Sequence, residues 1–271
     1  MGNKVQSKQI KYYIVIGSSR GLGAAMVEEL LKNEFYQVIG VARTKLEDVK
    51  THKEWIATKR YRHVVLDIAS SECSEILKGL CAYFSDVPIC VIFNAACIKQ
   101  DVTPDHFVDI KASKENNCVG INGLGYILKA FEGHFFKNGG LLVGISSVWG
   151  MTPPLSLPWM AYPATKAYLD MTMRCLRIFW KKKVDVVTIH LGHLDNSGAS
   201  RLPRWLSPTY PMTAKKIIRA ISGKQAPRDM YCPSIYRIFY NYLFRIVPDS
   251  LFIWLFTVLY RFAKTAEHRN S

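Results

Sequence analysis

Short apolar runs alternate with segments of helical periodicity along most of the chain. The runs begin near residues 12, 37, 62, 88, 140 and 184. The segment after the first run carries Met26, Leu30 and Leu31, which share one face of a helix. Continuous apolar strands separated by helices are typical of a parallel sheet that is covered on both faces. The pattern therefore predicts an α/β fold with a doubly wound parallel sheet.

A glycine-rich turn follows the first predicted strand, Tyr12 to Ile16. Its residues are Gly17, Ser18, Ser19, Arg20, Gly21, Leu22 and Gly23, and the first helix begins among them. Free backbone N–H groups and the helix dipole favour an anion at such a helix start. A strand, a glycine-rich turn and a helix in this order predict a phosphate cradle for a nucleotide.

Tyr162 and Lys166 lie four residues apart in a segment that reads as a helix. Side chains at this spacing share one helix face, so we expect the ammonium to lie near the phenol and to lower its pKa. Upstream, an apolar run ends at Ser146 and Ser147, followed by Gly150, as a buried strand ends before a loop. Ser147 is the preferred partner of the phenol, with Ser146 as a turn residue or a second donor. These residues predict a proton-donating site.

These motifs together resemble the short-chain dehydrogenase/reductases over roughly residues 10 to 200. The spacing of Gly17, Gly21 and Gly23 is similar to that family's cofactor loop. Asp67 resembles its adenine-contacting aspartate, and Asn94 with Ala95 resembles the motif below its cofactor. The resemblance implies a Rossmann-type fold in a single domain. Ile16, Cys97 and Leu191 depart from the family pattern and put the geometry of three loops in question.

The family resemblance also implies roles for the catalytic residues. It makes Tyr162 the general acid/base and Ser147 the donor that polarises a carbonyl, while Lys166 holds the nicotinamide ribose. The fourth member is an asparagine that holds a water in a proton relay. Asn117 and Asn122 both have a glycine three residues later. Because Ser113 looks like a helix cap, Asn122 lies deeper in the expected helix, which is where the family places its asparagine, and we choose Asn122 on that resemblance.

Charge indicates which cofactor is bound. Arg20 precedes the second glycine, and Arg43 ends the second strand, where an NAD enzyme carries an acid for the ribose hydroxyls. Two arginines suit a 2′-phosphate, so we expect NADP(H). The expected cofactor-binding residues are Gly17, Ser19, Arg20, Gly21, Leu22, Gly23, Arg43, Asp67, Asn94, Ala95, Tyr162, Lys166, Gly192 and Asn196. The alternative is that both arginines are solvated surface residues without a role in cofactor binding.

Composition fits one large domain without a linker, since 49% of 271 residues are hydrophobic. The seven cysteines show no zinc or disulfide spacing, so we expect reduced thiols in a cytosolic protein and no metal. The net charge of +15 is spread along the chain without a nucleic-acid-binding motif, which argues against a nucleic-acid partner.

Residues 1–200 are thus expected to form the cofactor-binding and catalytic core, and residues 201–271 a substrate lid and an apolar helical region. Apolar and aromatic side chains alternate with arginines between residues 234 and 263, in runs too short to span a bilayer. This pattern favours peripheral contact with a membrane, with a lid or an oligomer contact as the alternative. The family resemblance implies a homodimer or homotetramer.

Two classes of function follow from the sequence. The first is an NADP(H)-dependent oxidoreductase that interconverts a ketone or aldehyde and an alcohol on a small apolar or lipid-like substrate. The second is a catalytically silent NADPH sensor or scaffold at a membrane surface. All four catalytic positions are filled, which favours the enzyme.

Overall fold

The computed structural model of the protein describes residues 11–49, 52–84, 86–102, 108–152, 159–181, 183–195, 203–223 and 225–238, together with residues 250, 251, 254 and 258. Asn196 and most of the segment 234–263 lie outside the described residues. No helix among the described residues is long and apolar enough to cross a membrane.

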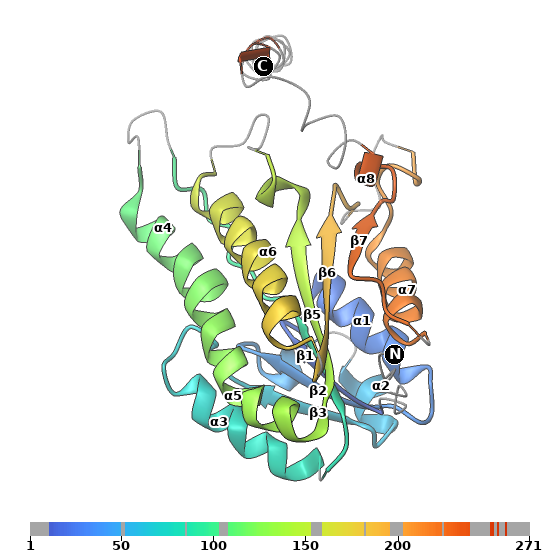
Figure 1. Cartoon of the computed structure of the whole chain (residues 1–271). Helices are drawn as coiled ribbons and strands as arrows, with labels where there is room; N and C mark the ends of the chain where they lie inside the picture. Colours follow the sequence, from blue (N-terminus) through green and yellow to red (C-terminus); the bar gives the residue numbers. More distant parts are fainter. Residues whose placement is uncertain are drawn as a thin grey trace, which may run out of the picture.

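Seven parallel strands form one sheet in the order β3-β2-β1-β4-β5-β6-β7 (Figure 1). They are β1 (Tyr12–Ile16), β2 (Gln37–Ala42), β3 (Tyr61–Val65), β4 (Ile89–Phe93), β5 (Gly140–Ser147), β6 (Val184–Leu191) and β7 (Asp229–Cys232). The chain order reverses between β1 and β4, and such a switch point is where ligands bind in open α/β sheets. The doubly wound fold predicted from the sequence is confirmed.

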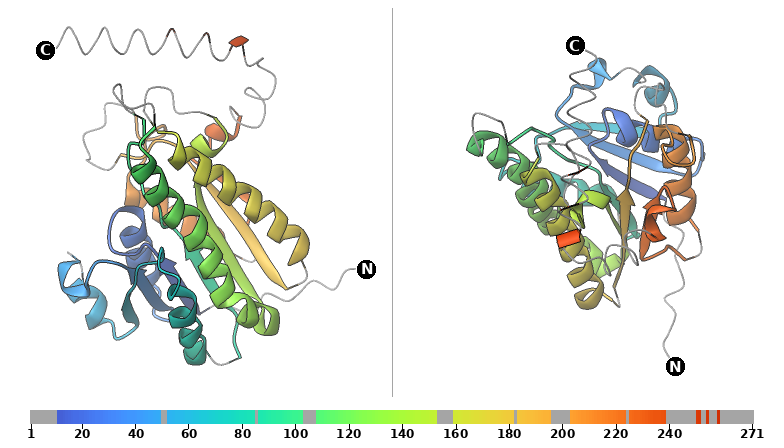
Figure 2. Two further views of the ribbon diagram at one scale, coloured as in Figure 1. Left: turned by 90° about the vertical axis from the view of Figure 1, so that its left-hand side faces the viewer. Right: turned by 90° about the horizontal axis from the view of Figure 1, so that it is seen from above.

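Helices cover both faces of the sheet, and Figure 2 shows the two layers from the side and from above. The first layer holds α1 (Gly21–Leu31), α2 (His52–Ala57) and α7 (Tyr210–Ile221). The second holds α3 (Cys73–Leu80), α4 (Ile110–Asn117), α5 (Gly123–Asn138) and α6 (Ala161–Phe179), and the short α8 (Tyr236–Ile238) follows β7. Buried aliphatic and aromatic side chains fill each interface, so the sheet has a separate apolar core on each face.

The seventh strand was not predicted from the sequence. β7 has only four residues, and its first residue, Asp229, is exposed, so it lacks an apolar run. It nevertheless pairs with β6, and α7 packs against α1. The division of the chain at residue 200 stays a prediction, but α7 and β7, which lie beyond it, belong to the layers of the core.

The start of α4 also differs from the expectation. The helix begins at Ile110, and Asp109 caps it by accepting hydrogen bonds from the backbone N–H groups of Lys111 and Ala112. Ser113, the predicted cap, lies inside the helix, where its hydroxyl donates to Asp101. A π-helical turn, Cys118–Asn122, then joins α4 to α5. Such turns are frequent at functional sites.

Candidate active site

The glycine-rich turn, the expected phosphate cradle, follows β1 at the switch point of the sheet. Gly17 and Gly21 have φ angles of 83° and 57°, which favour glycine. A Cβ on Gly23 would lie 1.9 Å from the carbonyl oxygen of Gly17, so only glycine allows this close approach of helix and turn. Arg20, the residue before α1, makes no side-chain hydrogen bond that caps the helix. The first-turn N–H groups of α1 therefore stay available to a phosphate, and the residues fit a dinucleotide.

Neighbouring strands hold this cradle in place. Val41 at the end of β2 accepts hydrogen bonds from the N–H groups of Gly17 (2.8 Å) and Ser18 (3.3 Å). Asn94, directly after β4, donates its side-chain amide to the carbonyl of Gly17 (3.2 Å). Asp67 lies exposed after β3, where Oδ1 accepts from the N–H of Ala69. These contacts place the expected cofactor-binding residues after β1, β2, β3 and β4 at one edge of the sheet.

Tyr162 and Lys166 lie in the first two turns of α6, and both side chains are buried. The Lys166 ammonium lies 5.7 Å from the centre of the Tyr162 ring and donates to the carbonyl of Ile145 at 2.8 Å. Ser147 ends β5 beside the phenol and accepts a hydrogen bond from the N–H of Trp149. Figure 1 shows the C-terminal end of β5 beside the start of α6. The structure thus brings together three of the four predicted catalytic residues.

Burial has the largest effect on the pKa values of Tyr162 and Lys166. It raises the pKa of Tyr162 to about 12, against the smaller lowering effect of a hydrogen bond from Ser147. It also lowers the pKa of Lys166 to about 8, against the negative charge of Asp170. The expectation from the sequence that Lys166 lowers the pKa of Tyr162 is therefore wrong for the protein alone, because loss of solvent raises that pKa. The phenol stays protonated at neutral pH, as a proton donor must.

The fourth position stays a prediction. Asn122 ends the π-helical turn with an exposed side chain, and Asn117 is exposed at the end of α4. Sequence reasoning missed Asn116, which is 1% exposed and bonds both the N–H and the carbonyl of Lys99. The sequence analysis expected the helix to start at Ser113, which placed Asn116 in its first turn. The helix starts at Ile110, so Asn116 lies well inside it. Asn116 therefore ties α4 to the loop after β4.

The π-helical turn, Cys118–Asn122, also lies against α6. A Cβ on Gly120 would lie 2.6 Å from Cβ of Thr165, which stands between Tyr162 and Lys166 in the sequence. Only glycine allows this approach, so Gly120 brings the backbone of the π-helical turn close to the site. The glycine three residues after Asn117 thus has a packing role, whereas a Cβ on Gly125 would meet nothing within 4 Å.

A second missed residue, Asp101, supports the start of α6. Its carboxylate is fully buried and accepts hydrogen bonds from the N–H groups of Met160 (2.8 Å) and Ala161 (2.7 Å). It also accepts from the hydroxyl of Ser113 at 2.9 Å. No local sequence signal reveals a contact across 60 residues. Asp101 therefore holds the helix turn that carries Tyr162.

Aromatic side chains surround the phenol. The rings of Trp149 and Trp159 lie 5.3 Å apart, and each lies about 6 Å from that of Tyr162, with edge-to-face geometry. Gly192, expected near the nicotinamide, lies after β6, where a Cβ would lie 2.2 Å from the ring of Tyr236 on α8. Two tryptophans thus pack against Tyr162, and Tyr236 of α8 packs over Gly192 at the end of β6.

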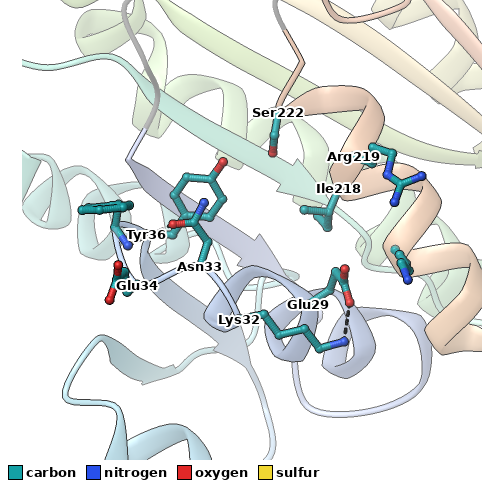
Figure 3. Close-up of a pocket in the computed structure, with 10 residues that line it drawn as sticks. Glu29, Lys32, Asn33, Glu34, Tyr36, Ile218, Arg219 and Ser222 are labelled. Carbon is teal, nitrogen blue, oxygen red and sulfur yellow. Dashed lines mark hydrogen bonds and ion pairs between the residues drawn. The ribbon is translucent and has the colours of Figure 1, made fainter.

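A surface hollow of about 530 Å³ lies away from this site (Figure 3). It is formed by the C-terminal end of α1, the turn that follows and α7. Charged side chains of both signs line it, among them Glu29, Lys32 and Arg219. None of its lining residues belongs to the predicted site, so we assign it no catalytic role.

The fold and the site together define a dinucleotide-binding oxidoreductase. The sequence profile described as short chain dehydrogenase matches residues 11–206, and the chain belongs to that family. It is 24% identical over 230 residues to a very-long-chain 3-oxoacyl-CoA reductase of Bos taurus, a match that covers 82% of this chain and 71% of that protein.

Solved structures show the same fold. A short-chain dehydrogenase from Streptomyces avermitilis has a TM-score of 0.73 at 20% identity, over 90% of this chain and 96% of that one. An NADPH-bound carbonyl reductase from chicken fatty liver has a TM-score of 0.69 at 17% identity, over 83% of this chain and 98% of that one.

Proposed function

We propose that the protein is an NADP(H)-dependent oxidoreductase that interconverts a ketone or aldehyde and an alcohol on a small apolar or lipid-like substrate. One observation carries this proposal. Ser147, Tyr162 and Lys166 meet at the carboxyl edge of the sheet, the same edge that carries the glycine-rich turn after β1.

In reduction, Tyr162 Oη donates its proton to the carbonyl oxygen, while Ser147 Oγ donates a hydrogen bond to the same oxygen. NADPH, when bound, supplies the hydride that the carbonyl carbon receives. Lys166, buried and cationic below about pH 8, favours the phenolate that remains. Asn122 holds the water through which the phenolate regains a proton. The expected holders of the cofactor are the residues of the cradle, with Asp67 at the adenine and Gly192 and Asn196 at the carboxamide.

The pH dependence of reduction follows from Lys166. Its pKa of about 8 lies below the ordinary value of a lysine, so the ammonium loses its proton as the pH rises through about 8. Tyr162 keeps its proton to about pH 12 and sets no limit in this range. We expect kcat/KM for carbonyl reduction, measured at saturating NADPH, to fall as the pH rises above about 8, because kcat/KM reports the enzyme form that the carbonyl meets. A Lys166→Arg variant that showed the same fall would assign the titration to another group.

Arg43 is expected to select the 2′-phosphate. Replacing it by Ala removes a charge-assisted hydrogen bond, which weakens NADPH binding roughly tenfold and leaves NADH binding near its native value. Titration calorimetry of Arg43→Ala with both nucleotides measures this. Arg62→Ala, on β3, is the matched control because its guanidinium stacks on Tyr83. Equal loss of both nucleotides in Arg43→Ala would remove Arg43 from cofactor choice.

The substrate is proposed to be lipid-like. The two tryptophans that pack against Tyr162 support this, and so does the similarity to a protein named as a very-long-chain 3-oxoacyl-CoA reductase. The test follows the loss of NADPH absorbance with 3-oxoacyl thioesters of increasing chain length, set against short polar ketones. A rate that rises with chain length supports the proposal, and turnover of only the polar ketones would refute it.

We also propose peripheral membrane contact through residues 234–263 and a homodimer or homotetramer. The side chains of Leu251 and Trp254 are at least half exposed, which supports the membrane contact. Exposed apolar side chains on α6, such as those of Met171 and Phe179, support an oligomer that covers this helix. Flotation with anionic liposomes tests the membrane contact. Protein that stays in the soluble fraction with and without this segment would end that idea.

A further inference from the structure

We propose that Tyr61 and His63 on β3 brace the turn that carries Arg43, so that they act as positioning residues for the choice between NADP(H) and NAD(H). The hydroxyl of Tyr61 lies 2.8 Å from Nδ1 of His63. Nε2 of the same imidazole lies 2.8 Å from the carbonyl oxygen of Thr44, the residue after Arg43. The inference rests on the proposed use of NADP(H).

The backbone around Arg43 is held on both sides. Val41 accepts from the N–H groups of the glycine-rich turn, and Ala42 accepts from the N–H of Leu66 at 2.9 Å. On the other side of Arg43, the carbonyl of Thr44 is held by His63. Thr44 lies past the end of β2, where the hydrogen bonds between neighbouring strands no longer hold its carbonyl in place. The imidazole therefore supplies the restraint that the sheet no longer gives.

The direction of these hydrogen bonds follows from their chemistry. A carbonyl oxygen only accepts, so Nε2 of His63 carries the hydrogen and donates to Thr44. In the neutral ring, Nδ1 is then an acceptor, and the hydroxyl of Tyr61 donates to it. The network thus holds one tautomer of His63.

The brace also reaches the glycine-rich turn. A Cβ on Gly40 would lie 2.1 Å from the hydroxyl of Tyr61 and 2.6 Å from Oγ of Ser18. Gly40 thus leaves room for the hydroxyls of Tyr61 and Ser18, which both lie over this glycine, although Ser18 Oγ makes no hydrogen bond among the described residues. Trp55 packs edge-on against the Tyr61 ring, with centroids 4.9 Å apart. The hydrogen bonds of the brace therefore run from Tyr61 through His63 to Thr44, and the Tyr61 end of the brace lies near Ser18 in the glycine-rich turn.

Arg43 is exposed and directly follows β2, at the edge of the sheet where a cofactor phosphate is expected. Burial raises the pKa of the Cys97 thiol, and the positive charge of Arg43 is near enough to oppose that rise. Cys97 follows β4, whereas Arg43 follows β2, and β1 lies between these two strands. Arg43 and Cys97 therefore follow strands that lie on either side of β1. A shift of the Thr44 carbonyl would move the backbone from which the Arg43 side chain extends.

The test measures the ratio of dissociation constants, NADH over NADPH, in variants of the brace. His63→Phe keeps a ring but removes both hydrogen bonds, and we expect the ratio to fall roughly three- to tenfold through weaker NADPH binding alone. Tyr61→Phe keeps the packing against Trp55, and we expect a smaller fall in the same direction. His63→Gln retains a donor for the carbonyl and restores part of the ratio.

His134→Phe is the matched control, because His134 Nε2 bonds the carbonyl of Val87 at 2.9 Å, among residues outside the proposed site. We expect it to lose thermal stability like His63→Phe while keeping the native ratio. If His63→Phe and Tyr61→Phe keep the native ratio, the two residues serve stability alone and the inference is wrong. Native protein that binds NADH as tightly as NADPH would instead overturn the proposed cofactor choice, before any variant is made.

Discussion

Tyr162→Phe is expected to lower kcat for carbonyl reduction roughly a thousandfold, because it removes the phenolic proton donor while keeping the ring. The aromatic contacts with Trp149 and Trp159 remain, so the fold of the site is retained. NADPH binding is expected to change little, since the glycine cradle is untouched. Steady-state kinetics and a nucleotide titration on the same preparation measure both effects.

Tyr168→Phe is the matched control, since Tyr168 lies on the exposed face of the same helix. It is expected to keep native kcat. A Tyr162→Phe variant with native kcat would show that the proton comes from another group. If the variant lost NADPH binding as well as kcat, the loss of rate could come from binding. Ser147→Ala is therefore measured beside it. We expect Ser147→Ala to lower kcat with intact NADPH binding.

Asp101→Ala is expected to destabilise the protein by about 3 kcal/mol or more, because three hydrogen bonds to a buried carboxylate are lost. For a chain of this size, that loss lowers the melting temperature by roughly 5 to 10 °C. It also frees the start of α6, so we expect kcat to fall roughly ten- to a hundredfold through misplacement of Tyr162. Thermal unfolding and steady-state kinetics provide the two measurements.

Ser113→Ala separates the two consequences. It removes one of the three hydrogen bonds to Asp101 and leaves both backbone N–H groups of α6 satisfied. We expect it to cost about 1 kcal/mol of stability and to leave kcat near native. If Asp101→Ala loses stability but retains native kcat, Asp101 supports the fold without positioning Tyr162.

Local patterns carried the parts of the site that sequence reasoning found. The glycine-rich turn, the Tyr162–Lys166 spacing and the strand that ends at Ser147 each lie within a few residues, so backbone geometry alone indicates them. Long-range contacts carried what it missed. Asp101 meets Ala161 across 60 residues, and the brace joins β3 to the turn after β2.

Burial explains the remaining differences. The sequence showed that Lys166 lies near Tyr162, but only the structure showed how little solvent reaches either group, which reverses the expected pKa change of the phenol. β7 was missed because four residues with an exposed start give no apolar run. Its place in the sheet depends on pairing with β6, which no local pattern shows.

The most direct test of the account is a titration of the native protein with NADPH and with NADH, followed by quenching of its tryptophan fluorescence. Trp149 and Trp159 lie beside Tyr162, so a nucleotide bound at the site is expected to change their emission. The account predicts binding of NADPH roughly tenfold or more tighter than binding of NADH. Failure to bind either nucleotide would contradict the proposed oxidoreductase.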